Sequence, residues 1–254
     1  FFTLPEDGRI YRDWKEGGHG DTNLFKAITQ SSNTYFFDLA YRSDINQLNK
    51  HLSSLGFGDK ACIDCFEEDQ VFVPEPSWKM NKHNFGWFKG DTVNMGVGQG
   101  YLVSTPIQLA KYAYIMANKG KFSDLSLKKD LVKSEKSIEF NKFSNDDWFK
   151  LHESMVNVIE GNTGTARRLR EKKNYIVAAK TGTAELVSGD NREQYSETRL
   201  DDSLRDHALI IAFGPMPNPR YAVSVVVENG ESGGSVAGPV AISVLNSLIQ
   251  EWDI

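Results

Sequence analysis

Residues 176–185 read Ile176-Val-Ala-Ala-Lys-Thr-Gly-Thr-Ala-Glu185, and this stretch decides the fold. Its small and β-branched side chains are typical of a buried strand. Lys180 interrupts the strand, and an ammonium group is costly to bury unless its charge is paired. Gly182 weakens a strand unless another group must approach the backbone closely at that point. We therefore predict a strand that faces a ligand or a catalytic helix.

Two more strands are expected after this stretch, at 207–213 and 220–228. The last of them contains Tyr221-Ala-Val-Ser-Val-Val-Val227, whose apolar character predicts a central place in the sheet. The polar segment 186–206 is long for a hairpin, and a terminal helix is expected at 235–252. Apolar periodicity and capping residues predict earlier helices at 23–30, 33–41, 44–55, 105–118 and 146–159.

Two segments between these helices lack a clear period. Residues 56–100 are rich in glycine and aromatic side chains, and mostly irregular structure is expected there. Residues 121–145 are polar and are expected to form a surface excursion. The order of elements, with helices first and strands last, indicates an α+β fold in which helices flank an antiparallel sheet.

Composition excludes several classes of function. The chain has 254 residues, 40% of them hydrophobic and 25% charged, which suits a soluble domain with a sizeable core. The net charge of -5 gives no support to nucleic-acid binding. No apolar run approaches the roughly 20 residues of a membrane helix. Because the chain opens with Phe1 rather than methionine, we expect a fragment or a processed chain.

Cys62 and Cys65 form a Cys-Ile-Asp-Cys unit. A thioredoxin-like role would require a strand-to-helix junction, but this unit follows Gly56-Phe-Gly58 and precedes an acidic stretch. No second cysteine pair completes a zinc site with it. We expect a loop pair that is either free or joined in a local disulfide.

Ser31-Ser-Asn33 lies between two predicted helices. Alone, such a tripeptide is usually a helix cap. About 150 residues later comes Lys180-Thr-Gly-Thr183. A Ser-x-Asn element followed by Lys-Thr-Gly on a strand is typical of serine acyl-transferases that also bind penicillin.

Further motifs occur in the same order as in one family: Arg12-Asp-Trp-Lys-Glu-Gly-Gly-His-Gly20, Ser31-Ser-Asn-Thr-Tyr-Phe-Phe37, Gly90-Asp-Thr92, Gly96-Val-Gly-Gln-Gly-Tyr101, Thr105-Pro-Ile-Gln108, Gly164-Thr-Ala166, Arg205-Asp-His207 and Glu228-Asn-Gly230. With them, residues 1–254 resemble the C-terminal part of the transpeptidase domain of a class B penicillin-binding protein. The elongation type, penicillin-binding protein 2, is the most similar. The resemblance implies the fold that these transpeptidases share with serine β-lactamases.

The resemblance also implies roles for individual residues. Ser31 would relay protons, and Asn33 would orient a catalytic lysine and the amide of the donor peptide. Lys180 would place a positive charge near Ser31 and the substrate carboxylate. Gly182 would allow close backbone approach. Thr183 would bind the same carboxylate and contribute its N–H to an oxyanion hole, whose donors are often worth about 3 kcal/mol each. No cofactor is required for this chemistry.

One part of the family pattern is absent. The nucleophilic serine belongs to a Ser-x-x-Lys motif that should lie upstream of Arg12. The literal match Ser126-Leu-Lys-Lys129 stands in the wrong place in the motif order, so we interpret it as a chance match. The nucleophile and its lysine are therefore expected before Phe1, and this fragment alone is expected to be inactive.

A zinc site is a second implication of the resemblance. Asp13 and His19 match two positions that hold zinc in some relatives. Ser32 stands where those relatives have a cysteine ligand, and serine is a poor zinc ligand. A structural role for Asp13 and His19 is favoured, and zinc binding is the alternative.

The resemblance implies a peptidoglycan D,D-transpeptidase of cell elongation. Its substrate would be a stem pentapeptide, and β-lactams would trap the same serine. A glycosyltransferase of the elongation machinery would be its partner, and an anchor outside this chain would hold it at the periplasmic face of the inner membrane. Two alternatives stay open: a serine β-lactamase or β-lactam sensor, and a non-catalytic scaffold that uses the fold for binding.

Three other features receive structural interpretations. Gly96-Val-Gly-Gln-Gly100 is expected to be a turn leading to the helix at 105–118, because no strand precedes it and no Lys-Ser/Thr follows. Trp78, Trp87 and Phe88 are expected to pack under a long loop, with a partner groove as the alternative. A basic cluster is expected to be a solvated face: Arg167, Arg168, Arg170, Lys172 and Lys173.

Overall fold

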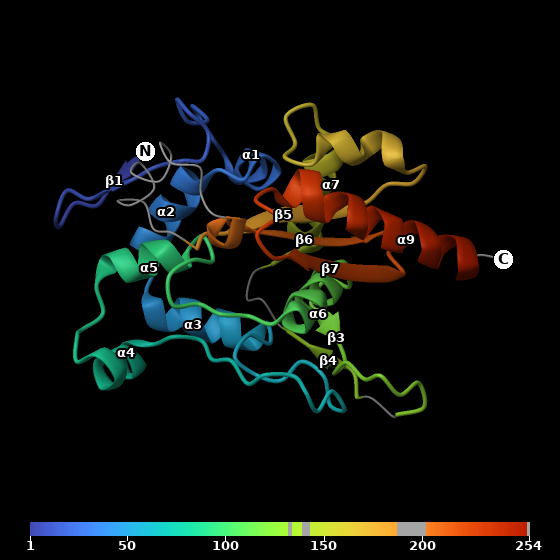
Figure 1. The fold of residues 1–254 in the computed structure, drawn as a ribbon, viewed down its shortest axis with the longest axis horizontal. Coiled ribbons are helices and arrows are strands. Elements are labelled where there is room, and N and C mark those ends of the chain that lie inside the picture. The colour runs from blue at the N-terminus through green and yellow to red at the C-terminus, as the bar shows by residue number, and fades with distance from the viewer. Residues whose placement is uncertain (132–133, 139–142, 187–201, 253–254) are drawn as a thin grey trace.

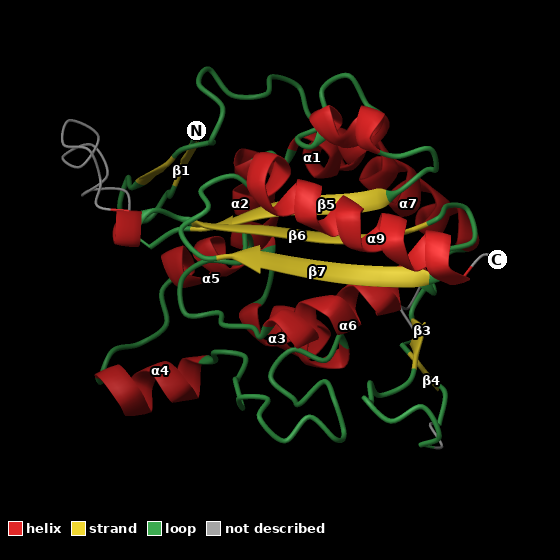
Figure 2. Cartoon of the chain, turned by 45° about the vertical axis from the view of Figure 1, so that its right-hand side comes forward, coloured by secondary structure: helices red, strands yellow, loops and turns green. Residues whose placement is uncertain are grey.

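The computed structural model describes residues 1–254 except 132–133, 139–142, 187–201 and 253–254. Its centre is an antiparallel sheet in the order β5–β6–β7 (Figure 2). The three strands are β5 (Ala178–Ala184), β6 (His207–Gly214) and β7 (Tyr221–Val227). The family resemblance implied this α+β arrangement, and it is confirmed.

Helices cover both faces of this sheet (Figure 1). On one face lies α9 (Gly238–Trp252), preceded by the π-helical turn η3 (Gly233–Ala237). The other face packs against α6 (Pro106–Ala117) and α7 (Asn145–Glu160). The remaining helices are α1 (Leu24–Gln30), α2 (Asn33–Arg42), α3 (Ile45–Ser54), α4 (Pro76–His83), α5 (Lys89–Met95) and the 3-10 helices η1 (Arg167–Lys172) and η2 (Asp202–Leu204).

Two small hairpin-like pairs complete the described structure. Near the N-terminus, β1 (Phe2–Thr3) pairs with β2 (Ile10–Tyr11). Below α6 in Figure 1, β3 (Lys121–Phe122) pairs with β4 (Lys136–Ser137).

The alternation of side chains along β6 divides the core into two layers. Ile210 and Ala212 are buried in the cluster that α9 covers. Ile211 and Phe213 are buried on the other side, with residues of α6 and α7. This period of two is what an antiparallel strand buried on both faces requires.

Local signals explain why the predicted helices form. Asn23 caps α1 by accepting a hydrogen bond from the Lys26 backbone N–H at 2.9 Å. Thr105 and Gln108 form a reciprocal capping box at the start of α6, followed by proline in the first turn. Ser144 and Asp147 form the same box on α7. The five helices predicted upstream of the sheet are confirmed, with ends shifted by at most one residue.

One prediction about the fold is wrong and another is incomplete. Residues 56–100 are mostly irregular as expected, but they also contain two short helices that were not predicted, α4 and α5, because proline in the first turn of α4 and Asp91 in the first turn of α5 give helix starts despite the many turn residues. The central strand of the described sheet is β6, not β7. The apolar character of β7 instead reflects its packing against helices on both faces.

Other predictions fall partly or wholly outside the described residues. Most of the polar segment 186–206 lies outside them. Part of the surface excursion at 121–145 does as well, while its described portion carries β3 and β4. Cys62 and Cys65 form a local disulfide, so the disulfide alternative is confirmed.

Gly96 permits close packing of α5 against α2. Its backbone is right-handed helical, so no unusual conformation requires glycine here. A Cβ at this position would lie 2.3 Å from the Cβ of Ala40 and 3.0 Å from the carbonyl oxygen of Phe36. Both of those neighbours belong to α2.

Gly96→Ala is therefore expected to destabilise the protein that carries this chain by about 1–3 kcal/mol through overpacking. Urea unfolding measures the change. Ala40→Gly removes the clashing atom, so the double variant is expected to lose less stability than the sum of the two single variants. Additive losses would contradict the proposed contact.

Candidate active site

The junction between α1 and α2 presents Ser31 in an unusual backbone conformation. Ser31 is left-handed, with φ 56° and ψ 49°, and its N–H caps α1 by donating to the carbonyl of Ala27 or Ile28. Such a conformation is uncommon for a residue with a side chain and is often found at functional sites. Ser32 then returns to extended backbone as the N-cap of α2.

Trp14 supports this junction from the preceding loop. Its indole N–H lies 2.9 Å from the carbonyl oxygen of Ser31 and 3.2 Å from that of Gln30. These carbonyls end a helix and lack intrahelical partners, so the indole satisfies orphan acceptors. The motif around Trp14 was recognisable in the sequence, but nothing there indicated that its N–H would hold Ser31.

Lys180 reaches this junction from β5. Its Nζ donates to Ser31 Oγ at 2.7 Å and to the carbonyl oxygen of Thr181 at 2.7 Å. Within the described residues, both acceptors are uncharged. Desolvation by burial lowers the pKa of Lys180 to about 8. The charge anticipated from the sequence is therefore held by neutral oxygens, which leaves it available to an anionic ligand.

This contact has a chemical consequence for Ser31. Because the lysine ammonium is the donor, the hydroxyl of Ser31 uses an acceptor lone pair for Lys180 and keeps its own proton for another group. A hydroxyl in that state can pass a proton onward. The predicted proximity of Ser31 and Lys180 is thus present in the structure.

The rest of β5 alternates between the site and the core. Thr181 points away from Lys180 and shares a hydrogen bond of 2.7 Å with the hydroxyl of Thr165. Gly182 lies against the turn at Gly233. A Cβ added to Gly233 would stand 2.6 Å from the Gly182 carbonyl oxygen. The glycines therefore allow the η3 backbone to approach β5. Thr183 is exposed at the end of the strand.

Asn33 is the first residue of α2 and is partly buried. The two hydrogen bonds of Lys180 go to Ser31 and Thr181 rather than to Asn33. The role of Asn33 in orienting a lysine and a donor amide stays a prediction.

Asp13 fastens the preceding loop to the start of α2. Its Oδ2 accepts hydrogen bonds from Ser32 Oγ at 3.1 Å, Thr34 N at 3.1 Å and Thr34 Oγ1 at 2.6 Å. Burial pushes the pKa of Asp13 upward, but the hydrogen bonds from the side chain and backbone of Thr34 outweigh it and hold the pKa below its usual value. One oxygen of the Asp13 carboxylate thus accepts hydrogen bonds from both Ser32 and Thr34, next to Ser31.

His19 is buried next to the Asp13 carboxylate. Its Nδ1 lies 3.2 Å from Asp13 Oδ2, but neither ring nitrogen has an aligned hydrogen-bond partner among the described residues. The ring contacts the indole of Trp14 edge-on, with centroids 5.6 Å apart.

These residues do not fit a zinc ion. A zinc ligand must be deprotonated, whereas Ser32 keeps its proton and donates it to Asp13. The same oxygen of Asp13 already accepts two hydrogen bonds from Thr34. Hydrogen bonds to Asp13 tie the loop to α2, and no step of the chemistry below passes through a metal.

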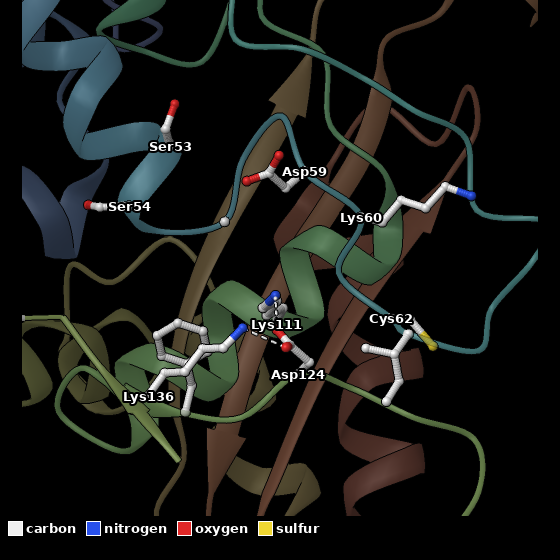
Figure 3. A pocket seen from close by; sticks show the side chains of 11 residues that line it. Ser53, Ser54, Asp59, Lys60, Cys62, Lys111, Asp124 and Lys136 are labelled. Atoms are coloured by element: carbon white, nitrogen blue, oxygen red, sulfur yellow. Dashed lines mark hydrogen bonds and ion pairs between the residues drawn. The ribbon is translucent and has the colours of Figure 1, made fainter. Parts of the chain in front are cut away.

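A separate cavity of about 440 Å³ lies between α3, α6 and the pair β3–β4 (Figure 3). Lys111 points toward Asp124 there, with 3.2 Å between Nζ and Oδ1, and Lys136 reaches the other oxygen at 2.6 Å. The hydrogen bond from Lys136, followed by that from Lys111, keeps the pKa of Asp124 below its usual value. None of the predicted site residues lines this cavity.

Several secondary interpretations can now be assessed. Lys173 and Arg170 of the basic cluster pair with Glu160, while Arg167, Arg168 and Lys172 are exposed as expected. Ser126 of the chance Ser-x-x-Lys match hydrogen-bonds Asp64 in the disulfide loop at 2.8 Å.

The glycine-rich turn after α5 contains a contact that sequence reasoning missed. Gln99 Nε2 donates to the Thr183 carbonyl oxygen at 3.0 Å. The motif containing Gln99 was recognised, but its spacing from β5 carries no sign of the contact.

The comparison with known families agrees with this geometry. The family described as "Penicillin binding protein transpeptidase domain" matches residues 2–246. The chain belongs to this transpeptidase family. Among its curated relatives, the peptidoglycan D,D-transpeptidase MrdA of Haemophilus influenzae is 36% identical over 99% of this chain. The chain spans 40% of the length of that relative.

Solved structures place the chain in the same part of the family. Pseudomonas aeruginosa PBP2 in complex with WCK 5153 is 35% identical, with a TM-score of 0.85, over 98% of this chain and 54% of that one. The complex between PBP2 and MreC from Helicobacter pylori contains a chain 31% identical, with a TM-score of 0.84. That match covers 96% of this chain and 43% of the other. The resemblance to penicillin-binding protein 2 is confirmed.

Chelation tests whether hydrogen bonds alone hold the loop that contains Asp13 and His19. We expect the thermal unfolding midpoint of the protein to be unchanged by EDTA, because hydrogen bonds to Asp13 hold the loop. Elemental analysis is expected to find much less than one zinc per chain. Ser32→Cys supplies the thiolate that the donor set lacks, so this variant is the positive control for zinc uptake. A stoichiometric zinc in the wild type would contradict the assignment.

Proposed function

We propose that this chain supplies one wall of the active site of a peptidoglycan D,D-transpeptidase of cell elongation. The hydrogen bond from Lys180 to Ser31 carries the proposal, because it joins the Ser-x-Asn and Lys-Thr-Gly elements in the order and chemistry that serine acyl transfer needs. The chain forms the C-terminal part of the transpeptidase domain of a longer protein, and the nucleophilic serine and its lysine precede Phe1.

The residues have separate roles in the proposed reaction. The upstream serine attacks the penultimate D-Ala carbonyl of a stem pentapeptide, and terminal D-Ala leaves. Ser31 relays a proton, which its geometry permits because Lys180 occupies a lone pair rather than the hydroxyl hydrogen. Lys180 attracts the substrate carboxylate, and Thr183 binds that carboxylate and contributes its N–H to the oxyanion hole. An amine of a neighbouring stem peptide then resolves the acyl-enzyme.

Partners and location follow from the relatives. β-Lactams would trap the upstream serine as slow acyl-enzymes. The Helicobacter pylori relative is found in a complex with MreC, which supports a role within a multiprotein assembly. The proposed assembly is that of cell elongation and includes a glycosyltransferase. Among the described residues, no helix combines the length and apolar character that crossing a bilayer demands. The proposed anchor at the periplasmic face of the inner membrane lies outside this chain.

Lys180→Ala in the full-length protein is expected to reduce acylation by a fluorescent penicillin by at least about 100-fold, because the site loses its cation. Gel fluorescence after timed labelling measures the rate, and circular dichroism checks the fold. Ser126→Ala is the matched control, since Ser126 belongs to the chance motif, and its labelling is expected to equal that of the wild type.

Normal labelling of Lys180→Ala would remove the role given to this lysine. Rapid turnover of nitrocefin by the wild type would instead favour the β-lactamase alternative. A full-length sequence without an upstream Ser-x-x-Lys would favour the non-catalytic scaffold.

The lowered pKa of Lys180 predicts a pH dependence. With a pKa of about 8, the side chain is about nine-tenths charged at pH 7 and about one-tenth charged at pH 9. The acylation rate should therefore fall about tenfold over this interval. Lys180→Arg keeps its charge throughout, so the ratio of wild-type to Lys180→Arg rates cancels the titration of other groups. A constant ratio between pH 7 and pH 9 would contradict the need for a charged Lys180.

A further inference from the structure

The turn after α5 is shaped to present the side chain of Gln99. Gly98 and Gly100 flank it with φ values of 76° and 75°. An added Cβ on Gly98 would meet nothing within 4 Å, so glycine is needed there for the backbone conformation and not for space. The backbone N–H of Gln99 returns to the carbonyl of Asn94 at 3.0 Å. The turn is thus anchored to α5 while the carboxamide extends toward β5.

The Thr183 carbonyl, which accepts the hydrogen bond from Gln99, lies on the edge of β5 that no described strand pairs with. In an antiparallel strand, the N–H and C=O of one residue point to the same side, and successive residues alternate. The carbonyls of Thr181 and Thr183 accept hydrogen bonds from the side chains of Lys180 and Gln99, not from the backbone of β6. The carbonyl of Ile176 instead accepts a backbone hydrogen bond from Met216 N, just beyond β6. Odd-numbered residues therefore face away from β6, and even-numbered residues face it.

This parity identifies what the edge offers to a ligand. Both the N–H and the C=O of Thr183 face outward from the described sheet, in which β5 is an end strand. An extended peptide can bind such an edge by donating an amide N–H to the carbonyl. Lys180, three residues earlier on the same strand, places its ammonium beside Ser31. The outward backbone groups of Thr183 and the ammonium of Lys180 therefore both lie near the C-terminal end of β5.

The carboxamide of Gln99 has the same donor chemistry as a peptide amide. In the structure it occupies the acceptor that an extended acyl donor needs. We propose that Gln99 is a specificity-determining residue: it satisfies the Thr183 carbonyl while the cleft is empty and yields it to the amide N–H of the donor. This inference rests on the proposed function and adds to it a residue of the chain that competes with the donor for one carbonyl.

Competition for one carbonyl has a measurable signature. A ligand with an amide N–H must displace Gln99, so removing the carboxamide should speed its acylation. A ligand without that N–H does not use the carbonyl, so its rate should not change. A purely structural role of Gln99 would instead alter both ligands in the same direction.

The test uses two penicillins in the full-length protein: one with an acylamino side chain, and the same compound methylated on the side-chain amide nitrogen. Gln99→Met keeps the length of the side chain and removes its donor. We expect the second-order acylation constant for the N–H penicillin to rise about two- to tenfold relative to wild type, the worth of one net hydrogen bond. The constant for the N-methyl penicillin is expected to stay the same.

Gln99→Ala repeats the test without the bulk of the side chain, and Gln99→Asn shows whether a shorter carboxamide restores competition. Equal changes for both penicillins, or no change for either, would overturn the inference. The outcome is separate from that of the proposed function: if wild type is labelled by neither penicillin, the transpeptidase proposal fails, whereas labelling without a split between the ligands rejects only the role of Gln99.

Discussion

The hydrogen bond between Lys180 and Ser31 is the interaction on which the rest of the site depends. It joins residues 149 positions apart, one on a buried strand and one at a helix junction. The strand tolerates the ammonium because neutral oxygens receive it, and burial lowers its pKa to about 8. A buried cation with no counter-ion among the described residues, placed beside a serine with left-handed backbone, costs free energy. The surrounding elements must therefore hold both Lys180 and Ser31 in place.

Much of the structure around that bond serves to hold it. Trp14 fixes the carbonyl of Ser31 from one side, and Asp13 fixes the start of α2 from another. Gly96 lets α5 pack closely on α2, which brings the turn carrying Gln99 to the end of β5. The loop before α2 is closed by hydroxyl-to-carboxylate hydrogen bonds from Ser32 and Thr34 to Asp13.

Sequence-based prediction succeeded where the signal acts between residues close together in the chain, and it failed where the signal was masked or depended on tertiary packing. Helices α1, α6 and α7 were predictable because caps such as Asn23 and Thr105 act within three or four residues. Helices α4 and α5 were missed because glycine and aromatic residues around them masked short helix starts. The order of the sheet was misjudged at β7, because an apolar strand can owe its character to helices on its faces as well as to a central position.

The sequence by itself determined the family, the three strands and the identity of Ser31, Asn33, Lys180, Gly182 and Thr183 as candidate residues. These conclusions rest on motif order and on local periodicity. Only the tertiary structure decided that Lys180 donates to Ser31, that one oxygen of Asp13 accepts hydroxyl and backbone donors, and that Gln99 occupies the Thr183 carbonyl. The physical reason is that each of these depends on the direction of a donor and an acceptor, which only the packed chain defines.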